Sequence, residues 1–255
     1  MSEIMHIIER SAVSRQEDVR DTAIILSMVF PILATVKYLD MMKYGKWFKT
    51  INHNLVHVFS ILHNMGLHMF SVYIFANLLG TLLRHGIVNW PGYYFELPGI
   101  KRLLFLFYVS KYYEYMDTVL LLAKGKKPIF LQKFHHCGAV IMWHLGYVFS
   151  LDALFFISLI NSGVHSIMYL YYLLSMFHSM RAMIRDIKIY ITSAQVGQLA
   201  FGFISMPYYY YAIESPTNRN VIVLFDMYIG ILLVLFTKFM VDSYFTVKIA
   251  KNTIR

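Results

Sequence analysis

The sequence predicts an all-α integral membrane protein with seven transmembrane helices, and three observations support this prediction. Of the 255 residues, 58% are hydrophobic and only 15% are charged, whereas a soluble domain usually carries about 25% charged residues. The 20 Phe, 20 Tyr and 16 Met residues are too many for the core of a soluble domain of this size. Apolar runs of roughly 20 residues, the length needed to cross a bilayer, recur along the whole chain.

These apolar runs define the predicted helices in chain order. The fourth is the shortest, and little more than Asp152 separates it from the fifth. Together the two runs are about twice as long as one bilayer crossing, so we expect a helical hairpin there. Pro31 and Pro207 lie inside runs, where proline can kink a helix. The predicted helices cover residues 22–39, 54–80, 102–123, 131–150, 152–176, 188–212 and 221–246.

The net charge of +9 is compatible with nucleic-acid binding at first sight. The charges lie in short segments between apolar runs, however, so we expect no nucleic-acid partner and a membrane protein with the usual positive-inside bias. Residues 1–21 mix acidic and basic side chains before the first apolar run, which argues against a cleavable signal peptide. We therefore expect one transmembrane domain over residues 1–255.

Seven crossings place the segments 1–21 and 247–255 on opposite sides of the membrane. The side with more Lys and Arg residues should be cytosolic, so the tail 247–255 is expected in the cytosol and residues 1–21 on the other side. The cytosolic set comprises Lys43, Lys46, Lys49, Lys124, Lys126, Lys127, Lys133, Arg181, Arg185, Lys188, Lys248, Lys251 and Arg255, and the smaller set comprises Arg10, Arg15, Arg20, Arg84, Lys101, Arg102 and Arg219.

Polar side chains inside apolar runs are costly and therefore mark candidate functional sites. In the third run, four such residues share a helical face about 120° wide. A lysine beside two carboxylates can neutralise most of its own charge, so the group is either part of a site or an ion-pair ladder that locks the helices together. The four residues are Lys111, Glu114, Asp117 and Thr118.

The fourth run begins with Gln132, His135 and His136 on one helical face. Two adjacent histidines indicate metal binding or acyl transfer, or else interfacial side chains that hydrogen-bond to headgroups and backbone. The single cysteine, Cys137, excludes an internal disulfide. Adjacent helical residues point about 100° apart, so Cys137 should face away from His136 and behave as a small buried hydrophobe rather than a nucleophile.

In the fifth run, His165 lies mid-span with Asn161 one turn before it, as expected for an oriented imidazole. Met168, Tyr169 and Tyr172 continue the same stripe and are equally compatible with core packing.

The sixth run carries a polar residue at every third position, at Thr192, Gln195 and Gln198. These side chains suit hydrogen bonds between helices in lipid at least as well as substrate contact. The histidines of the second run belong to no motif and are expected to be hydrogen-bonded inside the bundle. They are His53, His57, His63 and His68.

Four of these patterns, in this order on consecutive runs, resemble the ELO family of very-long-chain fatty-acid elongases. The resemblance covers roughly residues 30–250. The family motifs KxxExxDT, HxxHH, NxxHxxMYxYY and TxxQxxQ correspond to Lys111-Tyr-Tyr-Glu114-Tyr-Met-Asp117-Thr118, Gln132-Lys-Phe-His135-His136, Asn161-Ser-Gly-Val-His165-Ser-Ile-Met168-Tyr169-Leu-Tyr171-Tyr172 and Thr192-Ser-Ala-Gln195-Val-Gly-Gln198.

One position departs from the family pattern, because Gln132 stands where the first histidine of HxxHH is found. Some algal and protist elongases of polyunsaturated C18 acyl chains look similar, with glutamine after a Lys-Gly-Lys loop like residues 124–126. An amide cannot act as a base near neutral pH, so this position need not be a nucleophile or metal ligand. We expect Gln132 to orient a catalytic histidine, and the resemblance implies a preference for polyunsaturated C18 chains.

The resemblance implies that spans two to seven form a six-helix barrel of two inverted three-helix units around an acyl tunnel, with the first span outside. It also implies a multi-pass protein of the endoplasmic reticulum membrane. The implied activity is that of a very-long-chain 3-oxoacyl-CoA synthase, an acyltransferase that condenses a long-chain acyl-CoA with malonyl-CoA and releases CO2 and CoA. No cofactor or metal is expected, and malonyl-CoA would enter the reaction as a co-substrate. The implied partners are membrane lipid and the reductases and dehydratase of the elongation cycle, and a homodimer remains open.

The resemblance also assigns roles to residues. It implies an acyl-imidazole intermediate on His135, with His165 acting opposite it on the malonyl unit or the oxyanion and His136 as a third catalytic histidine. The supporting residues would be Lys111, Glu114, Asp117, Gln132, Asn161, Tyr169, Tyr172, Gln195 and Gln198, and the CoA phosphates would meet Lys124, Lys126, Lys127, Arg181, Arg185 and Lys188.

Two other classes of protein are weighed against this interpretation. A di-iron desaturase or hydroxylase also uses paired histidines, but it needs several histidine boxes, and the chain has one adjacent histidine pair. A seven-helix receptor or transporter would also carry polar residues inside its spans, but it gives no reason for the four ordered motifs.

Overall fold

The computed structural model describes residues 23–24 and 26–246, which are almost entirely helical and include no strand. The predicted flanking segments 1–21 and 247–255, with their basic residues, lie outside this described part. Within it, three helices are long and apolar enough to cross a membrane, namely His53–His85, Asp152–Leu174 and the continuous helical stretch Pro216–Phe245. The fold class is therefore that of an all-helical membrane protein.

A long helix occupies most of each predicted run, and the third run is divided at Glu114 into two helices. Four shorter α- or 3-10 helices, which the sequence analysis did not predict, lie in the connections: η1 (Met42–Tyr44), α3 (Gly45–Phe48), α5 (Tyr93–Glu96) and α10 (His178–Ile184). The long helices are α2 (Val29–Met41), α4 (His53–His85), α6 (Ile100–Tyr113), α7 (Tyr115–Ala123), α8 (Phe130–Val148), α9 (Asp152–Leu174), α11 (Ile187–Tyr208) and α12 (Pro216–Met240).

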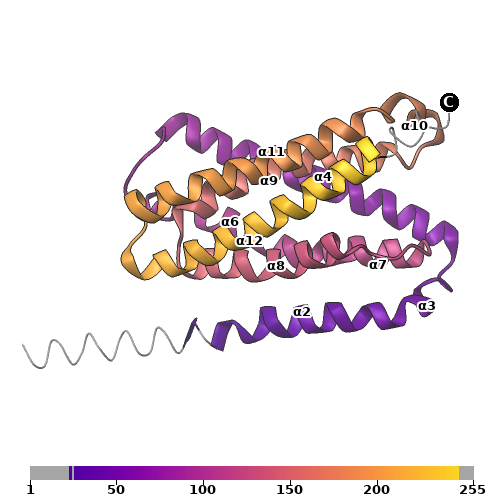
Figure 1. Cartoon of the computed structure of the whole chain (residues 1–255), viewed down its shortest axis with the longest axis horizontal. Coiled ribbons are helices and arrows are strands. Elements are labelled where there is room, and N and C mark those ends of the chain that lie inside the picture. The colour runs from indigo at the N-terminus through magenta and orange to yellow at the C-terminus, as the bar shows by residue number, and fades with distance from the viewer. Residues whose placement is uncertain (1–22, 25, 247–255) are drawn as a thin grey trace, which may run out of the picture.

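The long helices lie side by side along the long axis of the molecule (Figure 1). The most extensive contacts join α4 to α9 and α11 to α12, and α8 packs against α6, α12 and α2. Between α8 and α9 the chain reverses direction through residues 149–151, where Ser150 adopts a positive φ of 51°. The predicted hairpin between the fourth and fifth runs is therefore confirmed.

One end of the bundle gathers the segments that carry the larger set of basic residues. The end of α7, the start of α8 and the helices α3 and α10 all lie at this end in Figure 1. The loops from α8 to α9 and from α11 to α12 lie at the opposite end. With α6 and α7 counted together, consecutive long helices therefore alternate in direction, which brings the described cations of that set together.

The two prolines have different consequences. Pro31 lies in the first turn of α2, where proline is tolerated because that N–H has no intrahelical partner. Pro207 lies one residue before the end of α11, and the chain continues as a π-helix over Tyr209–Ile213. A proline deep in a helix removes one backbone donor, which is consistent with the change of hydrogen-bond pattern directly after Pro207.

At the end opposite the basic segments, the chain between α4 and α6 packs into the bundle. The Tyr94 ring is fully buried and stacks on Phe155 of α9 with centroids 4.1 Å apart. The Asp152 carboxylate, at the first residue of α9, accepts hydrogen bonds from the backbone N–H of Gly92 at 2.6 Å and of Tyr94 at 3.4 Å. These contacts pin the α4–α6 connection to the start of α9.

Candidate functional site

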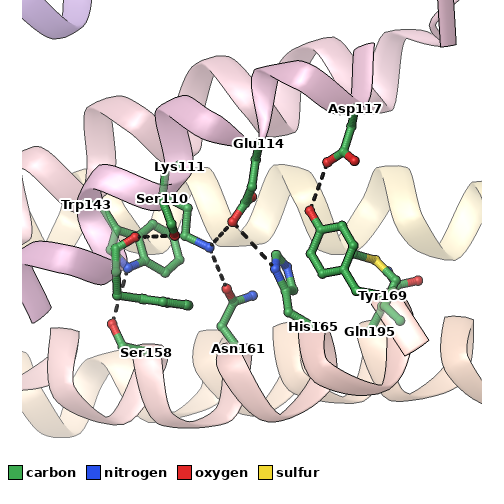
Figure 2. Close-up of polar contacts among 12 residues, drawn as sticks. Ser110, Lys111, Glu114, Asp117, Trp143, Ser158, Asn161, His165, Tyr169 and Gln195 are labelled. Atoms are coloured by element: carbon green, nitrogen blue, oxygen red, sulfur yellow. Dashed lines mark hydrogen bonds and ion pairs between the residues drawn. The ribbon is translucent and has the colours of Figure 1, made fainter. Parts of the chain in front are cut away.

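A buried ion pair lies within the third predicted run and is hydrogen-bonded to α9. The Lys111 Nζ atom donates to Glu114 Oε1 at 2.8 Å and to Asn161 Oδ1 at 3.1 Å (Figure 2). Lys111 is 1% exposed, and its ammonium also lies 4.0 Å from the centroid of the Phe107 ring. An ammonium buried without a partner would be strongly destabilising, so the carboxylate, the amide and the ring together account for its burial.

The same carboxylate faces His165. The His165 Nδ1 atom lies 3.7 Å from Glu114 Oε1, at ion-pair rather than hydrogen-bond distance (Figure 2). His165 is buried, and its Nδ1 atom has no hydrogen-bond partner among the described residues. Glu114 therefore lies between the lysine and the imidazole, and the imidazole keeps hydrogen-bonding capacity that the protein does not use.

Asp117 forms a second polar group. The sequence suggested that it pairs with Lys111, but in the described structure its carboxylate contacts other residues. Its Oδ1 atom lies 2.9 Å from His63 Nε2. Its Oδ2 atom accepts from the Tyr169 hydroxyl at 2.8 Å (Figure 2). His63 belongs to α4, and its side chain is fully buried. The sequence analysis gave His63 no role in a site, although a stripe of buried polar residues on α4, Ser60, His63, Asn64 and Ser71, could have indicated it.

Three imidazoles come together where α8 faces α9. The ring centroids of His135 and His165 are 6.4 Å apart, and those of His135 and His136 are 5.4 Å apart. His136 is buried, and its Nδ1 atom has no hydrogen-bond partner among the described residues. The two predicted histidine motifs therefore form one cluster, although 29 positions separate them in sequence.

In the described structure the Gln132 amide donates to a hydroxyl and makes no hydrogen bond to a histidine, so its orienting role stays a prediction. The Gln132 Nε2 atom donates to the Thr118 hydroxyl at 3.2 Å, and the same hydroxyl lies 2.8 Å from the Tyr38 hydroxyl of α2. Through this hydrogen bond the Gln132 side chain connects α8 to α7.

A cavity of about 490 Å³ lies inside the helical bundle and unites most of the predicted residues. Its wall runs from lysines in the α7–α8 loop, past the imidazoles, to an apolar part with Trp143, Phe156 and Phe225. The sequence analysis did not single out these aromatic residues. The predicted residues on the wall are Glu114, Asp117, Lys124, Lys126, Gln132, His135, His136, Asn161, His165, Tyr169, Tyr172, Gln195 and Gln198.

Two side chains that the sequence analysis weighed do not line the cavity. Glu114 lines the cavity and Lys111 does not, and the Lys111 ammonium acts as the counterion of the Glu114 carboxylate. Cys137 is half-buried and outside the lining, as expected from its direction relative to His136.

The predicted phosphate-binding cations divide into two groups. All six are exposed, but only Lys124 and Lys126 line the cavity. Burial lowers the pKa of the Lys124 ammonium from its ordinary value, and the neighbouring Lys126 charge acts in the same direction. An anion at this mouth would therefore relieve repulsion between two cations. The cations outside the lining are Lys127, Arg181, Arg185 and Lys188.

The cavity combines an apolar interior with a few convergent polar groups, which is typical of a small-molecule site. Its imidazoles can act as nucleophiles or bases, and its apolar part can hold a hydrocarbon chain. Among the described residues, no group of three or more His, Cys, Asp or Glu side chains is arranged to hold a metal ion. The fold and the site thus define a helical membrane protein with a histidine-lined apolar cavity.

The chain belongs to the ELO family, described as the GNS1/SUR4 family, whose model matches residues 23–252. It is 32% identical over 158 residues to fatty acid elongase 6 of Leishmania major, covering 58% of this chain but only 41% of that protein. It is 28% identical over 230 residues to fatty acid elongase sre1 of Dictyostelium discoideum, covering 86% and 84%. It is 32% identical over 195 residues to very long chain fatty acid elongase 1 of Homo sapiens, covering 73% and 70%.

Proposed function

We propose that this protein is a fatty-acid elongase that condenses a long-chain acyl-CoA with malonyl-CoA to give a 3-ketoacyl-CoA, CO2 and CoA. Membership of the ELO family supports fatty-acid elongation. The observation that carries the proposal is the meeting of His135 and His165 on one wall of a cavity whose remainder is apolar. A thioester held there would place its carbonyl beside an imidazole and its hydrocarbon chain away from water.

In the first half-reaction, a ring nitrogen of neutral His135 attacks the acyl carbonyl. A C–N bond forms, the C–S bond breaks, and the thiolate of CoA takes the proton that the imidazole loses. The product is an acyl-imidazole, which remains reactive toward nucleophiles. His136 and His165 lie beside His135, where their N–H groups could donate hydrogen bonds to the developing oxyanion.

In the second half-reaction, malonyl-CoA loses CO2 as its C–C bond breaks, and the electron pair forms an enolate. The enolate carbon attacks the acyl-imidazole, the C–N bond breaks, and the imidazole recovers a proton from solvent. Across both steps, one proton is consumed for each CO2 released. The Nδ1 atom of His165, which has no hydrogen-bond partner among the described residues, would hold the thioester oxygen of the enolate.

The CoA moiety would approach from the end of the bundle where Lys124 and Lys126 line the mouth of the cavity. Phosphate groups favour such pairs of cations. Lys127, Arg181, Arg185 and Lys188 are exposed at the same end and would add longer-range attraction. This end would face the cytosol, because it carries the larger set of basic residues.

The proposed topology has seven membrane crossings, with α6 and α7 together forming the third and α2 outside a barrel of the other six. The placement of helices on all seven predicted runs supports this topology. The C-terminus would be cytosolic, and the protein would reside in the endoplasmic reticulum membrane.

The test is expression in a host that lacks its own elongases, followed by fatty-acid profiling. Microsomes should incorporate label from malonyl-CoA into a 3-ketoacyl-CoA without added metal, and linoleate should be elongated in preference to stearate. Activity that disappears with a chelator and returns with iron would contradict the proposed chemistry. Elongation of stearate alone would contradict only the preference for polyunsaturated chains.

Gln132→Ala is expected to slow condensation by about two- to tenfold, the effect of losing one neutral hydrogen bond near a reacting group. The lost bond is the one to the buried hydroxyl of Thr118 on α7. Gln132→His should retain much of the activity, because an imidazole can also donate to a hydroxyl. Steady-state kcat of the three proteins, measured on the same acyl-CoA, checks this. An alanine variant as inactive as one without His135 would show that the amide does more than support the wall.

A further inference from the structure

A tyrosine of α12 forms a hydrogen bond to the backbone of the proposed nucleophile. The Tyr228 hydroxyl donates to the carbonyl oxygen of His135 at 2.9 Å. Tyr228 is 6% exposed, belongs to none of the motifs recognised in the sequence, and lines the cavity. In an α-helix the His135 carbonyl already accepts from the N–H four residues later. The Tyr228 bond is therefore a second, inter-helix bond to the residue on which the acyl group would be carried.

The approach of Tyr228 to α8 depends on a glycine. A Cβ atom added at Gly138 would overlap Cε2 of the Tyr228 ring and lie 2.7 Å from its Cδ2 and 2.9 Å from its Cζ. Gly138 lies three residues after His135, on the same side of the helix. The missing side chain therefore creates the space through which the ring reaches the His135 carbonyl. Phe134, whose ring centroid lies 5.7 Å from that of Tyr228, flanks the contact.

We propose that Tyr228 and Gly138 form a clasp that positions His135 for acyl transfer. The inference rests on the proposed function, since it assumes that His135 receives the acyl group. The clasp fixes the first turns of α8, which carry His135 and His136, against α12. Displacing a reacting group by about 1 Å can cost on the order of 100-fold in rate, so a rigid attachment beside the nucleophile has a direct kinetic effect.

The first test replaces Tyr228 by phenylalanine, which keeps the ring and removes the hydroxyl. The rate of CoA release from acyl-CoA, measured in a single turnover without malonyl-CoA, should fall by about two- to tenfold. The KM for acyl-CoA and the thermal midpoint in detergent should stay within error, because the ring still fills its place. Tyr73→Phe is the matched control, since this α4 ring is 52% exposed, and it should leave the rate unchanged.

The second test is a double-mutant cycle between positions 138 and 228. Gly138→Ala should slow acyl transfer more than Tyr228→Phe does, although alanine is the better helix former. In a Tyr228→Leu background, the alanine should cost much less, because the ring that it would overlap is absent. Coupled effects of this kind are expected only for residues in contact. Gly80→Ala on α4 is the control, because a Cβ there meets no atom within 4 Å.

The results separate this inference from the proposed function. If the wild-type protein forms no 3-ketoacyl-CoA, the proposed function fails. If the wild-type protein is active but Tyr228→Phe releases CoA at the wild-type rate, the clasp does not position His135. Equal costs of Gly138→Ala in the wild-type and Tyr228→Leu backgrounds would also overturn it. A Tyr228→Phe variant with unchanged single-turnover rate and raised KM would assign the tyrosine to substrate binding instead, which contradicts the proposal.

Discussion

His135→Ala is expected to abolish condensation, with a loss on the order of 10³-fold or more, as is usual when a catalytic nucleophile is removed. The covalent acyl-enzyme should disappear as well, because no neighbouring residue replaces the lost nitrogen at the same place. His135 lies on the cavity wall and is only partly buried, so the variant should still insert and fold. Single-turnover CoA release, malonyl incorporation and thermal stability in detergent measure the three effects.

Cys137→Ala is the matched control for this experiment. It changes a nearby residue on the same helix, but its side chain lies outside the cavity lining. The control should keep wild-type turnover. Wild-type turnover in His135→Ala would show that the nucleophile lies elsewhere, and a loss of activity in Cys137→Ala would then identify the thiol as the alternative.

Lys111→Met is expected to give the largest loss of stability among the site variants. The substitution keeps an unbranched side chain but leaves Glu114, which is 2% exposed, without its ion-pair partner. Removing one member of a buried ion pair costs about 3–5 kcal/mol. The double variant Lys111→Met with Glu114→Gln removes both charges and should recover part of this loss. Thermal or denaturant unfolding in detergent gives the comparison.

Lys238→Met provides a control, because it makes the same substitution in a lysine–carboxylate pair that is exposed rather than buried. Lys238 pairs with Asp242 at 2.6 Å, but both side chains are more than half exposed. Exposed pairs contribute about 0–1 kcal/mol, so this variant should unfold almost like the wild type. If Lys111→Met lowered the free energy of unfolding as little as Lys238→Met, the buried Lys111–Glu114 pair would contribute no more to stability than an exposed pair.

The positions of the long helices follow from the sequence because lipid imposes a strong and local requirement for apolar runs. The division of the third run at Glu114 does not follow, since no proline or glycine marks it. The short helices α3, α5 and α10 were also not expected. Helices of this length depend on their tertiary contacts rather than on a periodic pattern, as the burial of Tyr94 in α5 illustrates.

The site was predictable where its residues repeat at helical spacing, and it was not predictable where a contact joins distant parts of the chain. Glu114, Asn161 and His165 share stripes with other polar residues, and all three line the cavity. The bond from His63 to Asp117 spans 54 residues, and that from Tyr228 to His135 spans 93 residues. Nothing in a single sequence relates positions so far apart, because the pairing is created by helix packing.

The charges carried by α6 and α7 have a consequence for how the protein is made. In the proposed topology these helices cross the bilayer together, although neither is among the three described helices that are both long and apolar enough to cross alone. A lysine or aspartate near the centre of an isolated helix costs about 2.5–3.5 kcal/mol on insertion. His63, the partner of Asp117, is synthesised earlier, but Asn161, the neutral partner of Lys111, is synthesised later. Lys111 therefore has its carboxylate partner, Glu114, within the same segment, but its hydrogen bond to Asn161 can form only after α9 has been synthesised.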